Sequence, residues 1–148
     1  MNIRKAKLSD AKSLSILALS LRKYYNNNLE ISPFFAKKIT VEAFEGYLKN
    51  EEAYEHYVCQ VGKMVVGYCS LLNATHFLYL FVDEEYHKRD IAKNLVECAI
   101  KGKEHKTYSV NSSMYAVAFY EKLGFVSSAL VQNHNGMTYQ PMVWDRMK

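Results

Sequence analysis

A charged turn that runs straight into an apolar helical pattern is the part of the sequence best suited to chemistry. It is DEEYHKRDIAKNLV, residues 83–96, and it follows the apolar run HFLYLFV at 76–82. The first N–H groups of a helix have no partners within the helix, and the helix dipole attracts negative charge. The turn therefore favours an anion such as phosphate, with nearby cationic and donor groups from His87, Lys88, Arg89 and Lys93. The competing interpretation is a solvated helix start whose charges contact only water.

A second stretch, NSSMYAVAFYEKLGF at residues 111–125, contains a phenol that could transfer a proton. Its pattern predicts a helix that is capped by Ser112 or Ser113 and ends at Gly124. In that geometry the Phe125 ring packs on the Tyr120 ring. Packing of the Tyr120 ring is compatible with use of its hydroxyl. A purely structural role is the alternative.

The elements that must position these stretches are predicted from periodicity. Alternation with period two indicates strands, and apolar residues repeated every three or four positions indicate helices. Gly62 and the Asn135-Gly136 pair each predict a tight hairpin. The resulting order is β-α-α-β-β-β-α-β-α-β-β, a mixed α/β layer in which 76–82 is a central strand buried on both faces. Pro141 should place the last strand at an edge or at a bulge.

Length and composition favour one ordinary soluble domain. The chain has 148 residues, 49% of them hydrophobic, which suffices for one core but not for two, so we expect a single domain at 1–148. A net charge of +4 is too small to argue for nucleic acid. Three cysteines without a C-x-x-C motif suggest neither disulfides nor zinc and fit a cytoplasmic location. No apolar run reaches the roughly 20 residues that a membrane span needs.

Two windows of the chain, LYLFVDEEYHKRDIAKNLV and NSSMYAVAFYEKLGF, resemble motifs of the GNAT superfamily of acyl-CoA-dependent N-acetyltransferases. The first is similar to a strand followed by a pyrophosphate loop of pattern Q/R-x-x-G-x-G/A at a helix start. The second is similar to the motif in which Asn or Ser, Ala and Phe-Tyr precede Gly-Phe. The resemblance covers essentially the whole chain. It implies a GNAT-like mixed, mostly antiparallel central sheet flanked by helices, with acetyl-CoA as cosubstrate and no metal.

The resemblance also implies a role for individual residues. The strand backbone at Leu80, Phe81 and Val82 would pair with the pantetheine arm of the cofactor. His87 stands where Gln or Arg is usual, and Asp90 stands where Gly is usual. The six positions of the pyrophosphate loop are His87, Lys88, Arg89, Asp90, Ile91 and Ala92.

The same resemblance places Ser113 where many relatives have an Asn that contacts the cofactor, and Tyr120 on the family's frequent general acid. An amine acceptor is protonated at neutral pH and must lose a proton before it attacks a thioester, so a base or a chain of waters is needed. His76, early in the central strand, is a candidate base, and a packed strand residue is the competing interpretation. Glu84 and Glu85 are most simply a solvated loop. The remaining histidines receive no role: His56, His105 and His134.

The function indicated is direct transfer of an acetyl group from acetyl-CoA to a primary amine of a small molecule or peptide. The rival is a non-catalytic acyl-CoA or ligand-binding module of the same fold, for which Asp90 is the best support. In this family the acceptor pocket is built from regions that correspond to roughly 24–40 and 130–140. Residues 24–56 contain six glutamates and three lysines, a net charge of −3 that could attract a cationic amine, although exposed helical glutamates are the usual explanation. Homodimer formation is left open.

Overall fold

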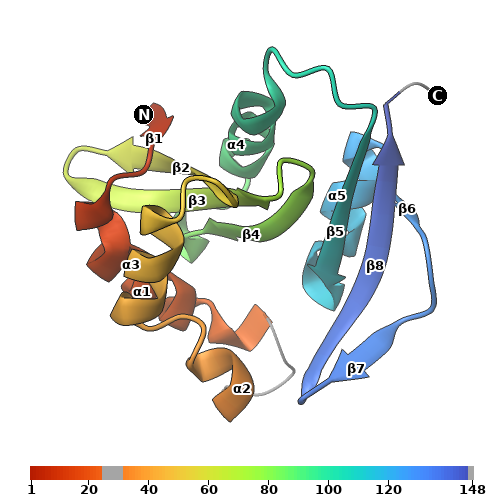
Figure 1. The fold of residues 1–148 in the computed structure, drawn as a ribbon, viewed down its shortest axis with the longest axis horizontal. Helices are drawn as coiled ribbons and strands as arrows, with labels where there is room; N and C mark the ends of the chain where they lie inside the picture. Colours follow the sequence, from red (N-terminus) through yellow and green to blue (C-terminus); the bar gives the residue numbers. More distant parts are fainter. Residues whose placement is uncertain (25–31, 147–148) are drawn as a thin grey trace.

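The structure, a computed structural model, describes residues 1–24 and 32–146. One sheet of eight strands forms its centre, in the order β1-β2-β3-β4-β5-β8-β6, with β7 also paired to β8 (Figure 1). The pairs are antiparallel except β4 with β5. The predicted mixed, mostly antiparallel sheet is therefore confirmed. The elements are β1 (Asn2–Lys5), α1 (Ala11–Ser20), α2 (Pro33–Ala36), α3 (Val41–Lys49), β2 (Tyr54–Val61), β3 (Met64–Leu72), β4 (His76–Val82), α4 (Ile91–Ile100), β5 (Thr107–Ser113), α5 (Val117–Leu123), β6 (Val126–Ser127), β7 (Gln132–His134) and β8 (Met137–Asp145).

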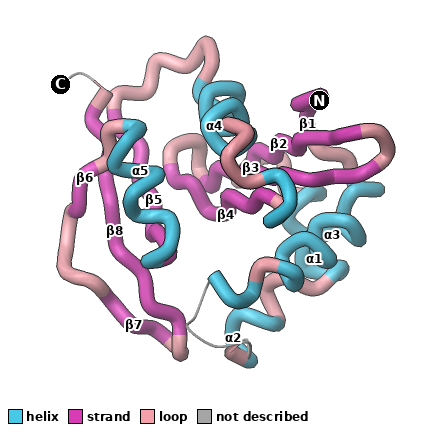
Figure 2. The backbone as a smooth tube through the Cα atoms, turned by 180° about the vertical axis from the view of Figure 1, so that it is seen from behind, coloured by secondary structure: helices cyan, strands magenta, loops and turns pink. Residues whose placement is uncertain are grey.

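Helices cover both faces of the sheet. α1 and α3 lie together on one side of β2, β3 and β4, and α4 lies on the other (Figures 1 and 2). The central strand β4 contributes to both cores, because Phe77 packs with the residues of α4 and α5 while Tyr79 and Phe81 pack with those of α1 and α3. This confirms the prediction of a central strand buried on both faces.

α4 lies close to the sheet because β3 has a glycine beneath it. A Cβ atom at Gly67 would meet Ile91 Cγ2 and Leu95 Cδ1, each at 3.0 Å. Both of these side chains are buried in the core under α4. Contacts this short are tighter than most real Cβ contacts, so a larger residue at 67 would require the Ile91 and Leu95 side chains to shift by a few tenths of an ångström.

The two halves of the sheet separate between β4 and β5. These strands pair in parallel only at His76 with Ser109 and at Phe77 with Val110. Beyond that point β4 continues to pair with β3 as far as Val82, whereas β5 pairs with β8. Figure 1 shows the two strands diverging. The residues of β4 after Phe77 therefore have a strand partner on one side only.

α5 ends as the sequence predicts but begins later. Gly124, at φ +119°, donates its N–H to the Glu121 carbonyl, and Phe125 donates to the Tyr120 carbonyl, both at 3.1 Å. These two bonds and the ring contact of Tyr120 with Phe125, at 5.3 Å between centroids, are those of a Schellman ending. The predicted caps are wrong, because β5 runs to Ser113 and a 3-10 turn, Met114–Ala116, precedes the helix. Neither serine side chain caps α5.

The two predicted hairpins are present. Val61 pairs with Met64 around Gly62, and His134 pairs with Met137 around Asn135-Gly136. β8 is an internal strand, so the alternative of an edge strand for Pro141 is wrong. Pro141 instead lies opposite the interruption between β6 and β7, where the Ser128 N–H donates to its carbonyl at 3.0 Å.

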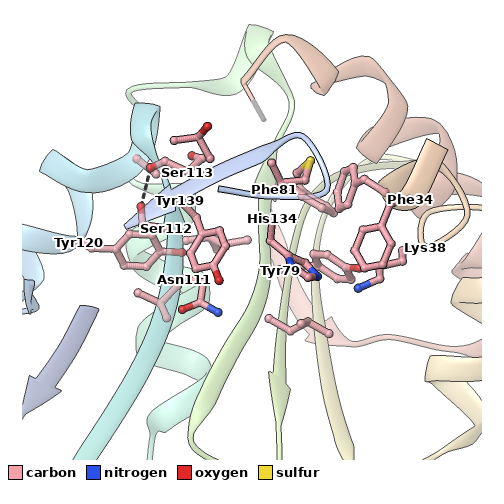
Figure 3. A pocket seen from close by; sticks show the side chains of 17 residues that line it. Phe34, Lys38, Tyr79, Phe81, Asn111, Ser112, Ser113, Tyr120, His134 and Tyr139 are labelled. Carbon is pink, nitrogen blue, oxygen red and sulfur yellow. Dashed lines mark hydrogen bonds between the residues drawn. The ribbon is translucent and has the colours of Figure 1, made fainter. Parts of the chain in front are cut away.

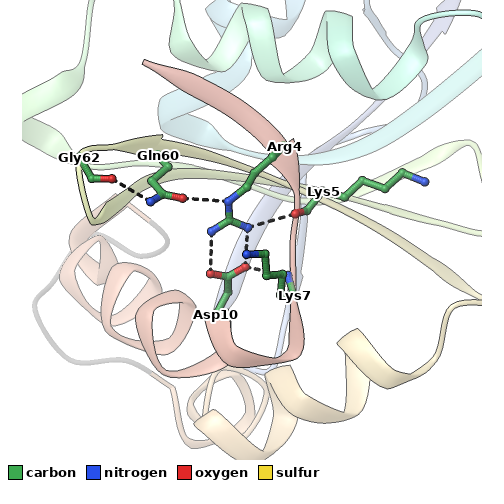
Figure 4. A network of polar contacts seen from close by, with 6 residues as sticks. All are labelled: Arg4, Lys5, Lys7, Asp10, Gln60 and Gly62. Carbon is green, nitrogen blue, oxygen red and sulfur yellow. Dashed lines mark hydrogen bonds and ion pairs between the residues drawn. The ribbon is translucent and has the colours of Figure 1, made fainter.

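An ion pair ties β1 to the start of α1 (Figure 4). The Arg4 guanidinium donates to both carboxylate oxygens of the buried Asp10, at 2.9 and 3.0 Å, and to Gln60 Oε1 at 2.8 Å. The Lys7 N–H donates to the same carboxylate at 2.7 Å. Burial alone would raise the pKa of Asp10, but the hydrogen bonds from Arg4 and Lys7 outweigh it and lower the pKa.

No helix within 1–24 and 32–146 is long and apolar enough to cross a membrane.

Candidate active site

A groove of about 600 Å³ runs between the end of β4, the start of α4 and the segment that leads into α5. It lies where the sheet separates, so the open edge of β4 forms part of its wall. Most of the predicted cofactor residues meet here, and Arg89 is the exception. Those that line the groove are Leu80, Phe81, Val82, His87, Lys88, Asp90, Ile91, Ala92 and Ser113.

The α4 end of the groove is suited to a diphosphate. The first helical bond joins the Asn94 N–H to the Asp90 carbonyl at 2.9 Å, so the preceding amides have no partner within the helix. Lys88, Lys93 and Lys122 line the same groove. Unpaired amides and ammonium groups at the N-terminus of a ten-residue helix are the donors that phosphate oxygens prefer. The residues present thus fit the pyrophosphate of CoA.

Asp90 is the residue of the loop that least suits an anion. Its backbone lies in the left-handed region, at φ +59° and ψ +17°. This explains why glycine is usual at the equivalent position of relatives, and aspartate is one of the few other residues that adopts this conformation readily. The substitution is therefore compatible with the loop geometry. Its cost is the carboxylate that it brings to the groove.

His87 is turned back from the loop toward β4. Its Nε2 lies 2.8 Å from the Val82 carbonyl, and its ring centroid lies 5.7 Å from that of Tyr24 and 6.3 Å from that of Tyr115. Tyr24 and Tyr115 also contact each other, at 4.3 Å. The sequence gives no periodic signal for this three-ring cluster, because its members come from three short segments that are far apart in the chain. Arg89 lies with its guanidinium 5.0 Å from the Tyr86 ring centroid.

The Glu84 carboxylate is bound by two residues of the 3-10 turn that follows α1. Lys23 Nζ lies 2.7 Å from Glu84 Oε1, and the Tyr24 hydroxyl donates to the same oxygen at 2.9 Å. The hydrogen bond from Lys23 lowers the pKa of Glu84. Neither Glu84 nor Glu85 lines a cavity described here, in agreement with the simple loop interpretation.

A second cavity, of about 300 Å³, lies beside the groove (Figure 3). One wall carries Phe34 and Lys38, with Tyr79 and Phe81 of β4, and the other carries Tyr120 with residues of β5 and β8. The regions that the family resemblance assigned to the acceptor do contribute to it, with 25–31 outside the described residues. From 24–40 these are Phe34, Phe35 and Lys38, and from 130–140 they are His134, Met137, Thr138 and Tyr139.

Tyr120 is buried, at 4% exposure, and lines this second cavity. Phe119 and Phe125 contact its ring, with centroids 5.2 and 5.3 Å away. Burial raises the pKa of the Tyr120 hydroxyl, which therefore keeps its proton at neutral pH. The ring is therefore held by packing, and its hydroxyl is protonated at the cavity wall.

His76 lies away from both cavities. It is the first residue of β4, at the end where β4 and β5 are still paired, and its Nδ1 lies 2.8 Å from Ser109 Oγ. Burial lowers its pKa. The structure does not bring His76 together with Tyr120, and it favours the interpretation of His76 as a packed strand residue. By contrast His134, to which the sequence assigned no role, lines the second cavity.

The groove and the second cavity share a wall. Leu80 and Phe81 of β4 and Ser113 and Ala116 before α5 line both of them. A profile of the family described as Acetyltransferase (GNAT) domain matches residues 22–146, which is most of the chain. The chain belongs to the GNAT family of acetyltransferases.

Solved GNAT structures share this fold over nearly their whole length. The PaiA N-acetyltransferase of Thermoplasma acidophilum, in complex with coenzyme A, is 19% identical, with a TM-score of 0.76 over 97% of this chain and 98% of that one. An aminoglycoside 6'-N-acetyltransferase complexed with coenzyme A is 17% identical, with a TM-score of 0.70 over 99% and 97%. A variant of spermidine N-acetyltransferase from Vibrio cholerae is 17% identical, with a TM-score of 0.69 over 99% and 95%. No curated protein sequence matches significantly.

Among the described residues, no group of three or more His, Cys, Asp and Glu is arranged to hold a metal ion. The residues that sequence patterns missed are Phe34, Tyr79 and Tyr139 on the cavity walls, together with Lys38. Their signal is weak because aromatics in strands and short helices usually indicate ordinary core packing.

Proposed function

We propose that this GNAT protein is an N-acetyltransferase that transfers an acetyl group from acetyl-CoA directly to a primary amine. The observation that carries the proposal is the wall shared by the groove and the second cavity. A thioester at the end of the groove and an amine in the cavity would meet at Leu80 and Ser113. Transfer then needs no intermediate on the protein, because both substrates are bound at once.

In this proposal the groove residues bind the cofactor and the cavity residues act on the reacting groups. The phosphates are held by the first amides of α4 and by Lys88, Lys93 and Lys122, and acetyl-CoA supplies the acetyl thioester. Tyr120 holds a proton at its hydroxyl in the second cavity, beside the shared wall at which the thiolate would form. The aromatic walls exclude water and so favour the neutral form of the acceptor amine. This reduces the demand for a dedicated base, a role for which His76 is badly placed.

The rival, a non-catalytic acyl-CoA-binding module, rested on Asp90. Its left-handed backbone accommodates aspartate, so the departure from glycine does not remove the loop. The second cavity, with a tyrosine hydroxyl in its wall, is also a feature that a pure CoA-binding module does not need. The cavity favours the enzyme, and the loop geometry removes the argument that Asp90 prevents CoA binding.

The test is release of CoA thiol from acetyl-CoA, measured with a panel of amines of different charge and size. Turnover that depends on the amine, with a mass increase of one acetyl group on it, supports the proposal. Thermal stabilisation of the protein by CoA without turnover on any amine would favour the binding module instead.

A further inference from the structure

The second cavity is aromatic and carries positive charge. Phe34, Tyr79, Phe81 and Tyr139 line it, together with the ammonium group of Lys38. Among the described residues, no aspartate or glutamate lines it. The glutamates of 24–56 that the structure describes lie elsewhere, on α3 and on the chain after it. A cationic acceptor would therefore find no carboxylate in these walls.

Lys38 is held so that its charge is available to a ligand. Its N–H donates to the Phe35 carbonyl at 2.8 Å, and its own carbonyl accepts from the Tyr47 hydroxyl, also at 2.8 Å. Its Nζ lies 4.1 Å from the centroid of the Phe34 ring, and His134 meets that ring edge-on at 5.5 Å. Within 1–24 and 32–146 no carboxylate forms an ion pair with Lys38.

Lys38, which carries the positive charge, and Tyr120, the candidate general acid, lie at opposite ends of the second cavity. In Figure 3 Tyr120 is at one side of the view and Lys38 at the other, with Tyr79 and Tyr139 between them. A ligand that presents its amine near Tyr120 thus extends past aromatic rings toward Lys38. A second positive charge at that far end is repelled by the Lys38 ammonium group, whereas a negative charge there forms an ion pair with it.

We propose that the acceptor is a primary amine on an aromatic or apolar skeleton, with an anionic group at the far end that pairs with Lys38. This inference rests on the proposed acetyl transfer and specifies its substrate class. It separates the protein from an enzyme for polycations, since a polyamine would leave a charge unpaired against Lys38. The anion is a carboxylate or a phosphate, which share the same recognition by an ammonium group.

Three acceptors of nearly the same shape isolate the far-end charge. They are 4-(aminomethyl)benzoate, 4-methylbenzylamine and 1,4-bis(aminomethyl)benzene, which carry an anion, no charge and a cation opposite the same amine. For the native protein we expect kcat/KM to fall in that order, by about fivefold per step, the effect of one partly exposed ion pair. An equal or greater kcat/KM for the dication would overturn the inference.

Substitutions at Lys38 test whether that residue is the cause. Lys38→Met should bring the benzoate and the methyl compound within about twofold of each other, and Lys38→Glu should reverse the order of benzoate and dication. Lys37→Met is the matched control, because Lys37 is exposed and does not line the cavity, and it should leave the order unchanged. An unchanged order in both Lys38 variants would overturn the inference.

Spermidine turnover and ligand binding separate this inference from the proposed function. Acetylation of spermidine with no preference for the benzoate would refute the anionic acceptor and leave acetyl transfer standing. Binding is measured by saturation-transfer NMR with CoA present. If no amine is acetylated but the compounds still bind in the Lys38-dependent order, acetyl transfer fails and the recognition stands. Absence of both turnover and ordered binding would overturn the inference as well.

Discussion

The Tyr120 hydroxyl offers the sharpest test of the chemistry, because it can be removed without removing the ring. The ring contacts Phe119 and Phe125 and forms the hydrophobic part of the Schellman ending of α5. Tyr120→Phe retains those contacts. We therefore expect the free energy of unfolding to change by no more than about 1 kcal/mol, and CoA affinity to stay the same, since Tyr120 does not line the groove.

Turnover should respond very differently. General acid catalysis contributes about 10² to 10⁴ in rate, or about 2.7 to 5.5 kcal/mol in the barrier. We expect kcat of Tyr120→Phe to fall by that factor. Because burial raises the pKa of Tyr120, its proton is retained as pH rises, and a group that must be protonated supports activity below its pKa. The native kcat should therefore show no alkaline loss from this residue up to about pH 10, the ordinary pKa of tyrosine.

The assay is thiol release at saturating acetyl-CoA, with Tyr108→Phe as matched control. Tyr108 is also a fully buried tyrosine, but it packs on Phe77 and Trp144 and lines neither cavity. The control should keep native kcat. If Tyr120→Phe turns over within about threefold of the native protein, Tyr120 is structural and water protonates the thiolate.

Four further substitutions, at three positions, have defined outcomes. Asp90→Gly and Asp90→Ala should both tighten CoA binding by about three- to thirtyfold in isothermal titration, because a carboxylate about 6 Å from a phosphate charge costs roughly 2 to 3 kcal/mol before screening. The Ala variant should be less stable than the Gly variant by about 1 kcal/mol, since the backbone φ of residue 90 is +59°. Tyr108→Phe should change the free energy of unfolding in urea by no more than about 1 kcal/mol, because its buried hydroxyl has Arg146 nearby but no hydrogen bond of good geometry among the described residues. Asp10→Asn should lower the free energy of unfolding by about 2 kcal/mol at pH 7. Since folding lowers the pKa of Asp10, the difference in stability should be full above about pH 4 and should vanish as pH falls through the pKa of the folded state. A difference that persists at lower pH would contradict the ion-pair argument.

Local patterns predicted most of the fold, because each pattern has one physical cause. Gly124 predicted the end of α5 since only a residue tolerant of positive φ suits that position, and Asn135-Gly136 predicted a hairpin for the same reason. The beginning of α5 was wrong because the Ser112 and Ser113 side chains cannot cap it: both residues belong to β5, which Gln140 and Tyr139 of β8 hold in the ladder. Pairing across the sheet overrode the local preference for a cap.

The site could be predicted on its cofactor side and only in outline on its acceptor side. A phosphate loop is a continuous stretch, so Lys88, Asp90 and Ala92 are neighbours in sequence as well as in space. The second cavity joins residues from α2, β4, β5 and β8. Nothing in the sequence near Lys38 indicates that Tyr139 lines the same cavity. The acidic composition of 24–56 suggested a cationic acceptor because composition averages over both faces of α3.

The place where β4 and β5 separate explains why the residues of the groove and those of the second cavity lie side by side. Two pairs hold these strands together at His76 and Phe77, and after them the β4 edge has no strand partner on the β5 side. A backbone edge in this position needs donors and acceptors from elsewhere. His87 supplies one of them to the Val82 carbonyl, and the remaining edge lines the groove and the second cavity together. The register that ends the parallel pairing after Phe77 therefore sets where a thioester and an amine could meet, and it also leaves His76, two residues too early, outside the chemistry.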